Sequence, residues 1–203
     1  KKYYYDGENI LAELDSSNNL TATYTHSPIR ADDVLGVNVT SYGVSSGSGG
    51  SAVSEGQVLA NSEGRLYYLK DHLGSINDIM NESGQIVQKM SYSAFGVVRS
   101  IKNSAGGEVA FESAPVRSSF TYTGREYEAE LGMYYYRARY YDPSTGRFLQ
   151  VDPDEGNINN PMTFLSKYVY TLNNPLMFTD SNGKSFLDDL FGGDAGIIGD
   201  VFD

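Results

Sequence analysis

The sequence contains no cysteine and no tryptophan, and its only histidines are His26 and His72. Without cysteine, neither a disulfide scaffold nor a thiolate metal site can form. Two histidines provide few ligands for a zinc site and few choices for a histidine-based catalytic triad. No apolar run approaches the ~20 residues of a membrane-spanning helix, and a net charge of −11 is the opposite of a basic surface that binds nucleic acid. We therefore expect no cofactor, no metal, no membrane span and no nucleic-acid partner.

Tyrosine, phenylalanine and glycine are abundant, with 17, 9 and 22 copies among 203 residues. Aromatic and β-branched residues favour strands, whereas glycine, serine and asparagine favour turns. The composition therefore predicts a mainly β protein, long enough for one large domain or two small ones. The opening residues, KKYYYDGENI, include neither an initiator methionine nor a secretory signal peptide, so we expect a piece of a longer chain.

One short pattern returns along the chain: Asp or Asn, two small or polar residues, Gly or Asn, a polar residue, and an apolar residue soon after. Asp and Asn bond their own backbone in turns, and Gly and Asn tolerate positive φ. Each copy is flanked by residues typical of strands, so each predicts the tip of an antiparallel β-hairpin. The copies at Asn61 and Asn81 are 20 residues apart, which indicates an array of hairpins. The five copies are residues 15–20, 61–66, 81–86, 142–148 and 180–186.

The tyrosine-rich stretch MYYYRARYY occupies residues 133–141. If it is one strand, Tyr134 and Tyr136 lie on one face, and Arg137 and Arg139 lie on the other. Neither face is purely apolar, which suits a wall whose inner surface is partly wet, because tyrosine rings pack while their hydroxyls bond water or a polar partner. We expect the two arginines to lie across tyrosine rings of neighbouring strands.

Three segments depart from the hairpin pattern. Residues 43–56, GVSSGSGGSAVSEG, have the composition of a flexible linker. Residues 101–119 are a polar excursion that we expect to form a surface loop. Residues 185–203 differ in composition from the rest, and we expect a short irregular or helical tail there.

Longer motifs resemble a known family. YYYDGENILAEL, near the start, resembles a YD repeat, and YYLKDHLGSINDIMNESGQIV at residues 67–87 is similar to the DHLGS block of Rhs proteins. FTYTGREYEAELGMYYYRARYYDPSTGRFLQVDP, followed by YVYTLNNPLMFTDSNG, resembles the Rhs repeat-associated core domain. The resemblance covers nearly the whole chain up to about Lys184, and its motifs are long and in order.

The resemblance implies a fold in which antiparallel β-hairpins form part of a curved, hollow shell. YD-repeat hairpins would occupy residues 1–100, including the linker at 43–56, and the loop at 101–119 would follow. The Rhs repeat-associated core would occupy residues 120–184, and residues 185–203 would begin a variable C-terminal region. In such a shell, the tyrosines would build a wall around an enclosed space and would not form a dense centre.

The resemblance also implies candidates for catalysis. In many bacterial Rhs proteins the core domain resembles an aspartyl protease that cuts its own chain once, using two Asp-Pro-x-Gly motifs. The matching positions here are Asp152 and Asp180, and the cut would fall near Lys184. Two close carboxyls share one proton, so that one activates water while the other protonates the carbonyl oxygen. Arg147, just after a turn, is the third candidate, and we expect it to pair with a carboxylate or a tyrosine ring.

The sequence departs from the protease pattern at three places. Asp152 has an extra residue before its glycine, Ser181 occupies the position of the usual proline, and Lys184 stands where an apolar residue is usual. We therefore favour a protein that is not an enzyme, in which Asp152 and Asp180 are turn residues that bond their own backbone. The alternative is an intramolecular aspartyl autoprotease.

Two other motifs have both a chemical and a structural interpretation. Residues 152–159 alternate Asp and Asn as calcium ligands do, but the position of glycine differs from that in an EF-hand and no closing glutamate follows. We favour a solvated acidic loop. His72 follows Asp71 in KDHLGS, but no serine or cysteine nucleophile is beside it, so we expect His72 to bridge neighbouring hairpins by hydrogen bonds.

By resemblance, the chain is a structural shell segment of a bacterial Rhs-type polymorphic toxin, secreted or displayed at the cell surface and used against competing cells or a host. Its partners would be the rest of the parent shell, a C-terminal toxin that the shell encloses or presents, and an immunity or delivery protein. The alternative is a cell-surface adhesion or recognition module built on YD repeats, because exposed tyrosines suit contacts with sugars or proteins.

Overall fold

The computed structural model describes residues 2–7, 9–28, 33–39, 64–116, 118–153 and 166–184. The predicted linker at 43–56, most of the predicted acidic loop at 152–159 and the tail at 185–203 lie outside these residues. The described residues are mainly β and all their strand pairs are antiparallel, as predicted from the sequence. None of their helical turns is long and apolar enough to cross a membrane.

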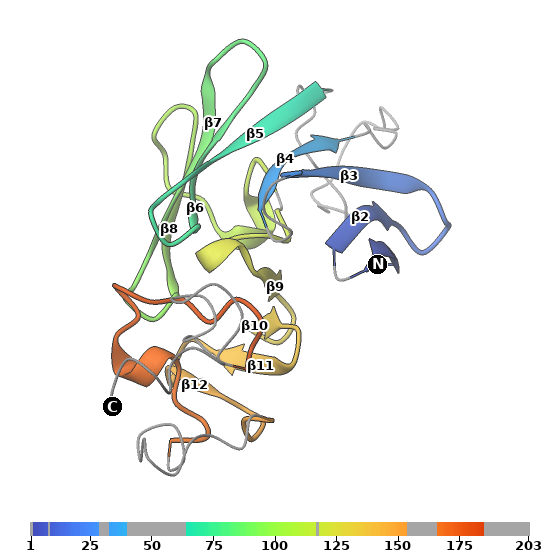
Figure 1. Ribbon diagram of the computed structural model, residues 1–203. Helices are drawn as coiled ribbons and strands as arrows, with labels where there is room; N and C mark the ends of the chain where they lie inside the picture. The colour runs from blue at the N-terminus through green and yellow to red at the C-terminus, as the bar shows by residue number, and fades with distance from the viewer. Residues whose placement is uncertain are drawn as a thin grey trace.

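Eight consecutive strands form one meandering sheet in chain order, and four shorter strands form a second sheet in the order β12-β11-β10-β9 (Figure 1). Six of the seven pairings in the first sheet contain a register shift, and such bulges increase the twist of a sheet. The strands are β1 Lys2–Asp6, β2 Asn9–Leu14, β3 Leu20–His26, β4 Val34–Val39, β5 Gly64–Lys70, β6 Ile76–Met80, β7 Ile86–Tyr92, β8 Val98–Asn103, β9 Glu126–Glu128, β10 Met133–Tyr136, β11 Arg139–Asp142 and β12 Arg147–Phe148. Three 3₁₀ turns accompany them: η1 Phe111–Ser113, η2 Tyr122–Gly124 and η3 Thr171–Asn173.

The hairpin tips of the first sheet repeat one hydrogen-bond pattern. Between β2 and β3, the Oδ1 atom of Asp15 accepts the backbone N–H groups of Ser17 and Asn19, both at 2.8 Å. Between β6 and β7, Asn81 accepts the corresponding N–H groups two and four residues further on, at 3.0 and 2.9 Å. The fourth residue of each tip has positive φ, 66° at Asn18 and 79° at Gly84. The predicted tips at residues 15–20 and 81–86 are therefore confirmed.

Other tips follow the same rule. Asp142 joins β11 to β12 as predicted, and its Oδ1 accepts the N–H of Ser144 at 2.8 Å. The predicted tip at residues 61–66 begins outside the described residues. The tips that the sequence analysis missed begin at Asp71, Ser93 and Asn103.

Residues 104–113 are mostly exposed, as expected of a surface loop, whereas the end of the predicted loop is buried. The first residues of the predicted loop complete β8, and the segment then returns across one face of the first sheet, where Ala114 and Val116 are buried in its apolar core. Gln88 of β7 is also buried, and its Oε1 accepts the N–H of Val116 at 2.7 Å. The sequence did not predict this buried part, because the polar composition of the segment hides the few small apolar residues that pack on the sheet.

The stretch at residues 133–141 is a hairpin and not one continuous strand. Tyr134 pairs with Tyr141 and Tyr136 pairs with Arg139, so β10 and β11 are connected by only two residues. The first of these is Arg137, which adopts a φ of 59°. Because the chain reverses, the buried face carries Tyr134 and Tyr136 of β10 together with Arg139 and Tyr141 of β11.

The buried tyrosines form a dense aromatic core, which the sequence did not predict. Tyr134, Tyr136, Tyr141 and Tyr170 are all 0% exposed, and their rings pack against Tyr122 and Phe148. Burial raises the pKa of Tyr136 to about 12, so its hydroxyl remains a neutral donor. The hydroxyls of three core tyrosines also join the two sheets, because they donate to consecutive carbonyls of the β7–β8 tip. These bonds are Tyr122 to Ala94, Tyr141 to Phe95 and Tyr134 to Gly96, at 2.9, 2.9 and 2.8 Å.

Candidate functional site

Arg139 is the charged residue at the centre of the candidate site. It opens β11, directly after the turn of the β10–β11 hairpin, and its side chain is only 2% exposed. Strand alternation places it on the same face as Tyr141, and its guanidinium carbon lies 3.7 Å from the ring centroid of Phe148. From the sequence we expected this arginine to lie across a tyrosine ring, but the ring is that of Phe148.

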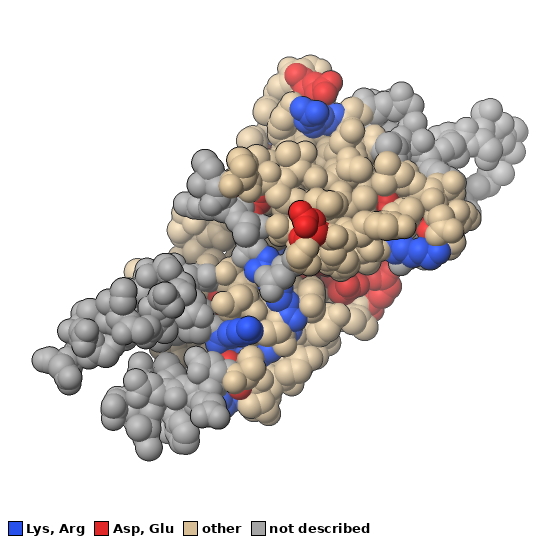
Figure 2. All heavy atoms as spheres, turned by 45° about the vertical axis from the view of Figure 1, so that its right-hand side comes forward, with Lys and Arg blue, Asp and Glu red and all other residues tan. Residues whose placement is uncertain are grey.

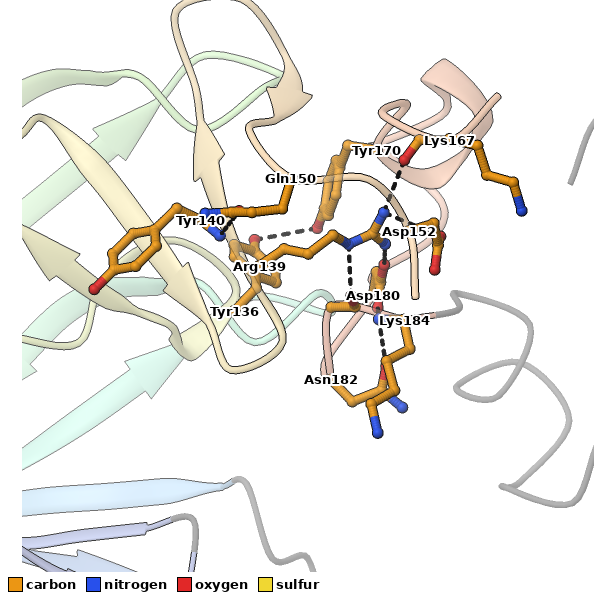
Figure 3. A network of polar contacts seen from close by, with 11 residues as sticks. Tyr136, Arg139, Tyr140, Gln150, Asp152, Lys167, Tyr170, Asp180, Asn182 and Lys184 are labelled. Atoms are coloured by element: carbon orange, nitrogen blue, oxygen red, sulfur yellow. Dashed lines mark hydrogen bonds and ion pairs between the residues drawn. The ribbon is translucent and has the colours of Figure 1, made fainter. Parts of the chain in front are cut away.

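The guanidinium of Arg139 binds both aspartates that the sequence singled out. Its Nη1 lies 3.0 Å from Oδ2 of Asp152, and its Nη2 lies 3.0 Å from Oδ2 of Asp180. Two backbone carbonyls complete its contacts: Nε donates to Gly183 at 2.5 Å, and Nη1 donates to Lys167 at 3.2 Å. Figure 3 shows the guanidinium between these groups, which come from three separate parts of the C-terminal segment. We call this arrangement the Arg139 clip.

The turn that begins at Asp180 is shaped to fit the clip. Asp180 uses its second oxygen, Oδ1, to accept the N–H of Lys184 at 3.1 Å, as in the hairpin tips. Gly183 has a φ of 68°, and a Cβ atom there would lie 2.2 Å from the carbonyl oxygen of Tyr136. A glycine is therefore required at this position, both by the backbone conformation and by the close approach of the turn to β10.

The electrostatics of the clip combine one buried cation with two carboxylates of unequal burial. The side chain of Asp180 is 4% exposed and that of Asp152 is 19% exposed. Bonds between a guanidinium and a carboxylate are among the strongest in proteins, and a buried charge is tolerated only when it is paired. The clip can anchor the C-terminal segment to β11. It also brings two carboxyl groups close to a backbone carbonyl that accepts a hydrogen bond from the guanidinium.

The structure places the remaining candidates elsewhere. Arg147 is exposed in β12, where it pairs with Asp142 across the β11–β12 ladder. The arginine at the two aspartates is Arg139, which the sequence analysis did not propose for this site. The sequence offered one sign of this role, a charged residue that alternates with tyrosines along a strand. That sign does not tell which side of the strand Arg139 occupies unless the hairpin turn is recognised.

His72 bridges distant segments, in line with the structural interpretation of its motif. Its Nε2 lies 3.1 Å from the carbonyl oxygen of Leu176, while Asp71 accepts backbone N–H groups of its own turn at 3.0 and 2.9 Å. Within the described residues, no group of three or more His, Asp or Glu side chains could hold a metal ion.

Comparisons with known proteins identify the family. The family model described as Teneurin YD-shell matches residues 54–177, which is more than half of the chain. The chain belongs to the teneurin YD-shell family. The match includes Arg139 and Asp152 and ends before Asp180.

Several relatives of this YD-shell chain are toxins. The tRNA nuclease WapA of Bacillus subtilis (strain 168) is 32% identical over 183 residues, which cover 89% of this chain and 6% of WapA. Toxin subunit YenC2 of Yersinia entomophaga is 43% identical over 67 residues, or 33% of this chain and 6% of YenC2. Toxin protein Tse5 of Pseudomonas aeruginosa is 32% identical over 138 residues, or 64% of this chain and 9% of Tse5. The chain thus spans less than a tenth of each of these relatives.

Solved structures share the fold of this YD-shell chain. The crystal structure of TcdB2-TccC3-Cdc42 matches with a TM-score of 0.58 at 22% identity, covering 86% of this chain and 7% of that one. The crystal structure of TcdB2-TccC3 matches with a TM-score of 0.53 at 23% identity, covering 89% of this chain and 9% of that one. The mainly antiparallel β architecture is therefore shared with these toxin structures.

Proposed function

We propose that this YD-shell segment is part of the shell of a secreted or surface-delivered polymorphic toxin, and that the shell encloses or presents a toxin that follows it in the parent chain. The relatives include a tRNA nuclease and two toxins, and each aligns with this chain over less than a tenth of its length. A short segment shared by toxins of different kinds is better suited to a common container than to one toxic activity.

The Arg139 clip is the observation that carries this proposal. It ties Asp180 and Gly183 to β11, and the N–H of Lys184 is held by Asp180 at 3.1 Å. The chain that continues after Lys184 therefore starts from a point fixed on the second sheet. A toxin attached there would begin at the wall of its container.

The surface also supports assembly with more shell. On the face shown in Figure 2, most of the described surface belongs to uncharged residues. Leu149, Val151, Leu176 and Met177 are each at least half exposed, and exposed apolar residues are typical of contact surfaces. The partners we propose are the remaining shell and the C-terminal toxin, with a delivery or immunity protein as a further partner.

Limited proteolysis of the full-length parent protein tests the enclosure. We expect the region after residue 184 to resist protease in the intact parent and to be digested rapidly when produced alone. Arg139→Leu in the parent should increase its digestion, because the anchor is lost, whereas Arg147→Leu, at an exposed position, should not. Equal digestion of this region in the intact parent and in isolation would contradict the proposal.

Self-cleavage is a second candidate activity, and it is favoured by the meeting of Asp152 and Asp180 on one guanidinium. Hydrolysis near Lys184 would add water to a peptide carbonyl carbon and break its C–N bond. One aspartate would take a proton from water and pass it to the leaving nitrogen, and the other, protonated at the start, would protonate the carbonyl oxygen and recover that proton as the bond breaks. Nε of Arg139 already donates to the carbonyl of Gly183 at 2.5 Å, as a group that stabilises developing negative charge would.

Intact-mass spectrometry of the parent protein tests self-cleavage separately from enclosure. We expect a new terminus near Lys184 in the wild-type protein and none in Asp152→Asn or Asp180→Asn. Asp142→Asn is the matched control, because Asp142 forms the same kind of turn away from the clip. An uncut wild-type chain, or equal cutting in all variants, would exclude the catalytic role and leave the shell proposal standing.

A further inference from the structure

A small cavity of about 20 Å³ lies where the first sheet meets the second. Ile10 of β2, His26 of β3 and Val34 of β4 line it from the first sheet. Glu126 of β9 and Tyr135 of β10 line it from the second. The cavity therefore lies at a junction between the two sheets.

Charged and titratable groups face the cavity from both sheets. His26 places Nε2 2.7 Å from the carbonyl oxygen of Ile10, and its Nδ1 is buried without a hydrogen-bond partner among the described residues. Arg125 and Arg137 line the cavity on the side of the second sheet. Glu126 is the carboxylate in the lining.

Glu126 has both acidic and basic neighbours. Glu128 follows it two residues later on the same strand, so both side chains lie on one face of β9. Burial and then the charge of Glu128 raise the pKa of Glu126 to about 7; Glu13 adds to the rise, and Arg125 opposes it. The titratable groups of β1 that interact with this carboxylate are Tyr3 and Tyr5.

We propose that this junction is proton-sensitive, and that it tightens when Glu126 takes up a proton and loosens when Glu126 is ionised. The neutral carboxyl is easier to bury than the carboxylate, and it no longer repels Glu128 and Glu13. This property goes beyond the proposed container function, and it would make the shell more stable in mildly acidic than in alkaline surroundings.

The direction of the effect follows from proton binding. Between the ordinary pKa of 4.5 and the raised value of about 7, the folded state holds a proton on Glu126 that the unfolded state has lost. The stabilisation is therefore complete below about 4.5 and is lost as the pH rises through about 7. Between about pH 8 and about pH 5.5, this single group should raise the folded-to-unfolded ratio about 30-fold.

Urea unfolding of the 203-residue chain at about pH 5.5 and about pH 8 tests the proposal. Between these two pH values, the folded-to-unfolded ratio should change by a factor that is roughly tenfold or more larger in the wild type than in Glu126→Gln. Glu130→Gln is the matched control, because Glu130 is exposed two residues beyond β9, and it should behave as the wild type does. Comparing variants at the same two pH values cancels the contributions of the two histidines.

A direct titration gives an independent readout if a variant folds poorly. In the wild-type chain labelled with ¹³C at glutamate carboxyls, the resonance assigned to Glu126 should titrate with a midpoint near 7, and Glu128→Gln should move that midpoint lower. The proposal is overturned if Glu126 titrates near its ordinary pKa of 4.5, or if Glu126→Gln and Glu130→Gln respond identically to pH.

Discussion

Replacing Arg139 by leucine should destabilise the C-terminal segment by about 3–5 kcal/mol. The variant keeps an apolar contact with Phe148 but removes the guanidinium from Asp152 and Asp180. It also leaves the carbonyl oxygens of Gly183 and Lys167 without this donor. The expected loss is large because the aspartates would lose the cation that makes their burial tolerable.

The two aspartates should contribute very unequally to that loss. Asp180 is 4% exposed and cannot regain water without moving its turn, so it accounts for most of the cost. Asp152 is 19% exposed and can rotate toward solvent, so its pair with Arg139 should contribute only about 1 kcal/mol. The double variant Arg139→Leu/Asp180→Asn should therefore recover about 2 kcal/mol, because asparagine removes the unpaired charge while keeping a turn acceptor.

Urea unfolding followed by tyrosine fluorescence measures these differences, because the chain has 17 tyrosines and no tryptophan. Arg147→Leu is the matched control at an exposed position in β12, and it should change the free energy of unfolding by less than about 0.5 kcal/mol. Hydrogen exchange should show the loss of protection first at residues 180–184. A loss below about 1 kcal/mol in Arg139→Leu, or no recovery in the double variant, would refute the view that the clip pairs a buried charge.

Three further substitutions test the turns and the aromatic core. Gly183→Ala should lower the free energy of unfolding by more than about 2 kcal/mol, since its Cβ would meet the carbonyl of Tyr136 at 2.2 Å. Gly84 has a similar φ but open space around it, so Gly84→Ala should cost only about 1 kcal/mol. Equal urea midpoints for the two variants would contradict the close approach. Tyr134→Phe removes the bond to the carbonyl of Gly96 and should lower the free energy of unfolding by about 1–1.5 kcal/mol in thermal denaturation; an unchanged melting temperature would mean that this bond is absent. Asn81→Ala removes the side-chain oxygen that accepts two backbone N–H groups at an exposed tip. It should cost about 1 kcal/mol, visible as faster amide exchange confined to that tip; exchange that stays at the wild-type rate would count against the shared turn pattern.

The sequence predicted the tips at Asp15 and Asn81, but the tips at Asp71 and Asn103 were missed although their side chains form the same hydrogen bonds. Asp15 and Asn81 each bind N–H groups two and four residues away, so five consecutive residues are enough to specify the turn. The turn at Arg137 was missed because neither Gly nor Asn marks it. Pairing between β10 and β11 imposes the positive φ on Arg137, and such pairing is invisible to a local pattern.

The sequence also identified Asp152 and Asp180, through a resemblance to a motif, but it did not identify their partner. Arg139 lies 13 residues before Asp152 and 41 before Asp180, and only the return of the C-terminal segment onto β11 brings the three together. The arginine that the sequence proposed was Arg147. It precedes the buried Phe148 by one residue in β12, so its side chain lies on the opposite, exposed face of that strand.

Local chemistry in the sequence thus determined the strand class, the antiparallel hairpins and the tips that join them, because these depend on contacts within a few residues. Tertiary structure alone decided that the tyrosines pack into a dense core, that residues 101–119 partly cover a sheet, and that Arg139 holds two distant aspartates. Those outcomes depend on which side of each strand faces inward, and a one-residue change in a turn reverses that choice.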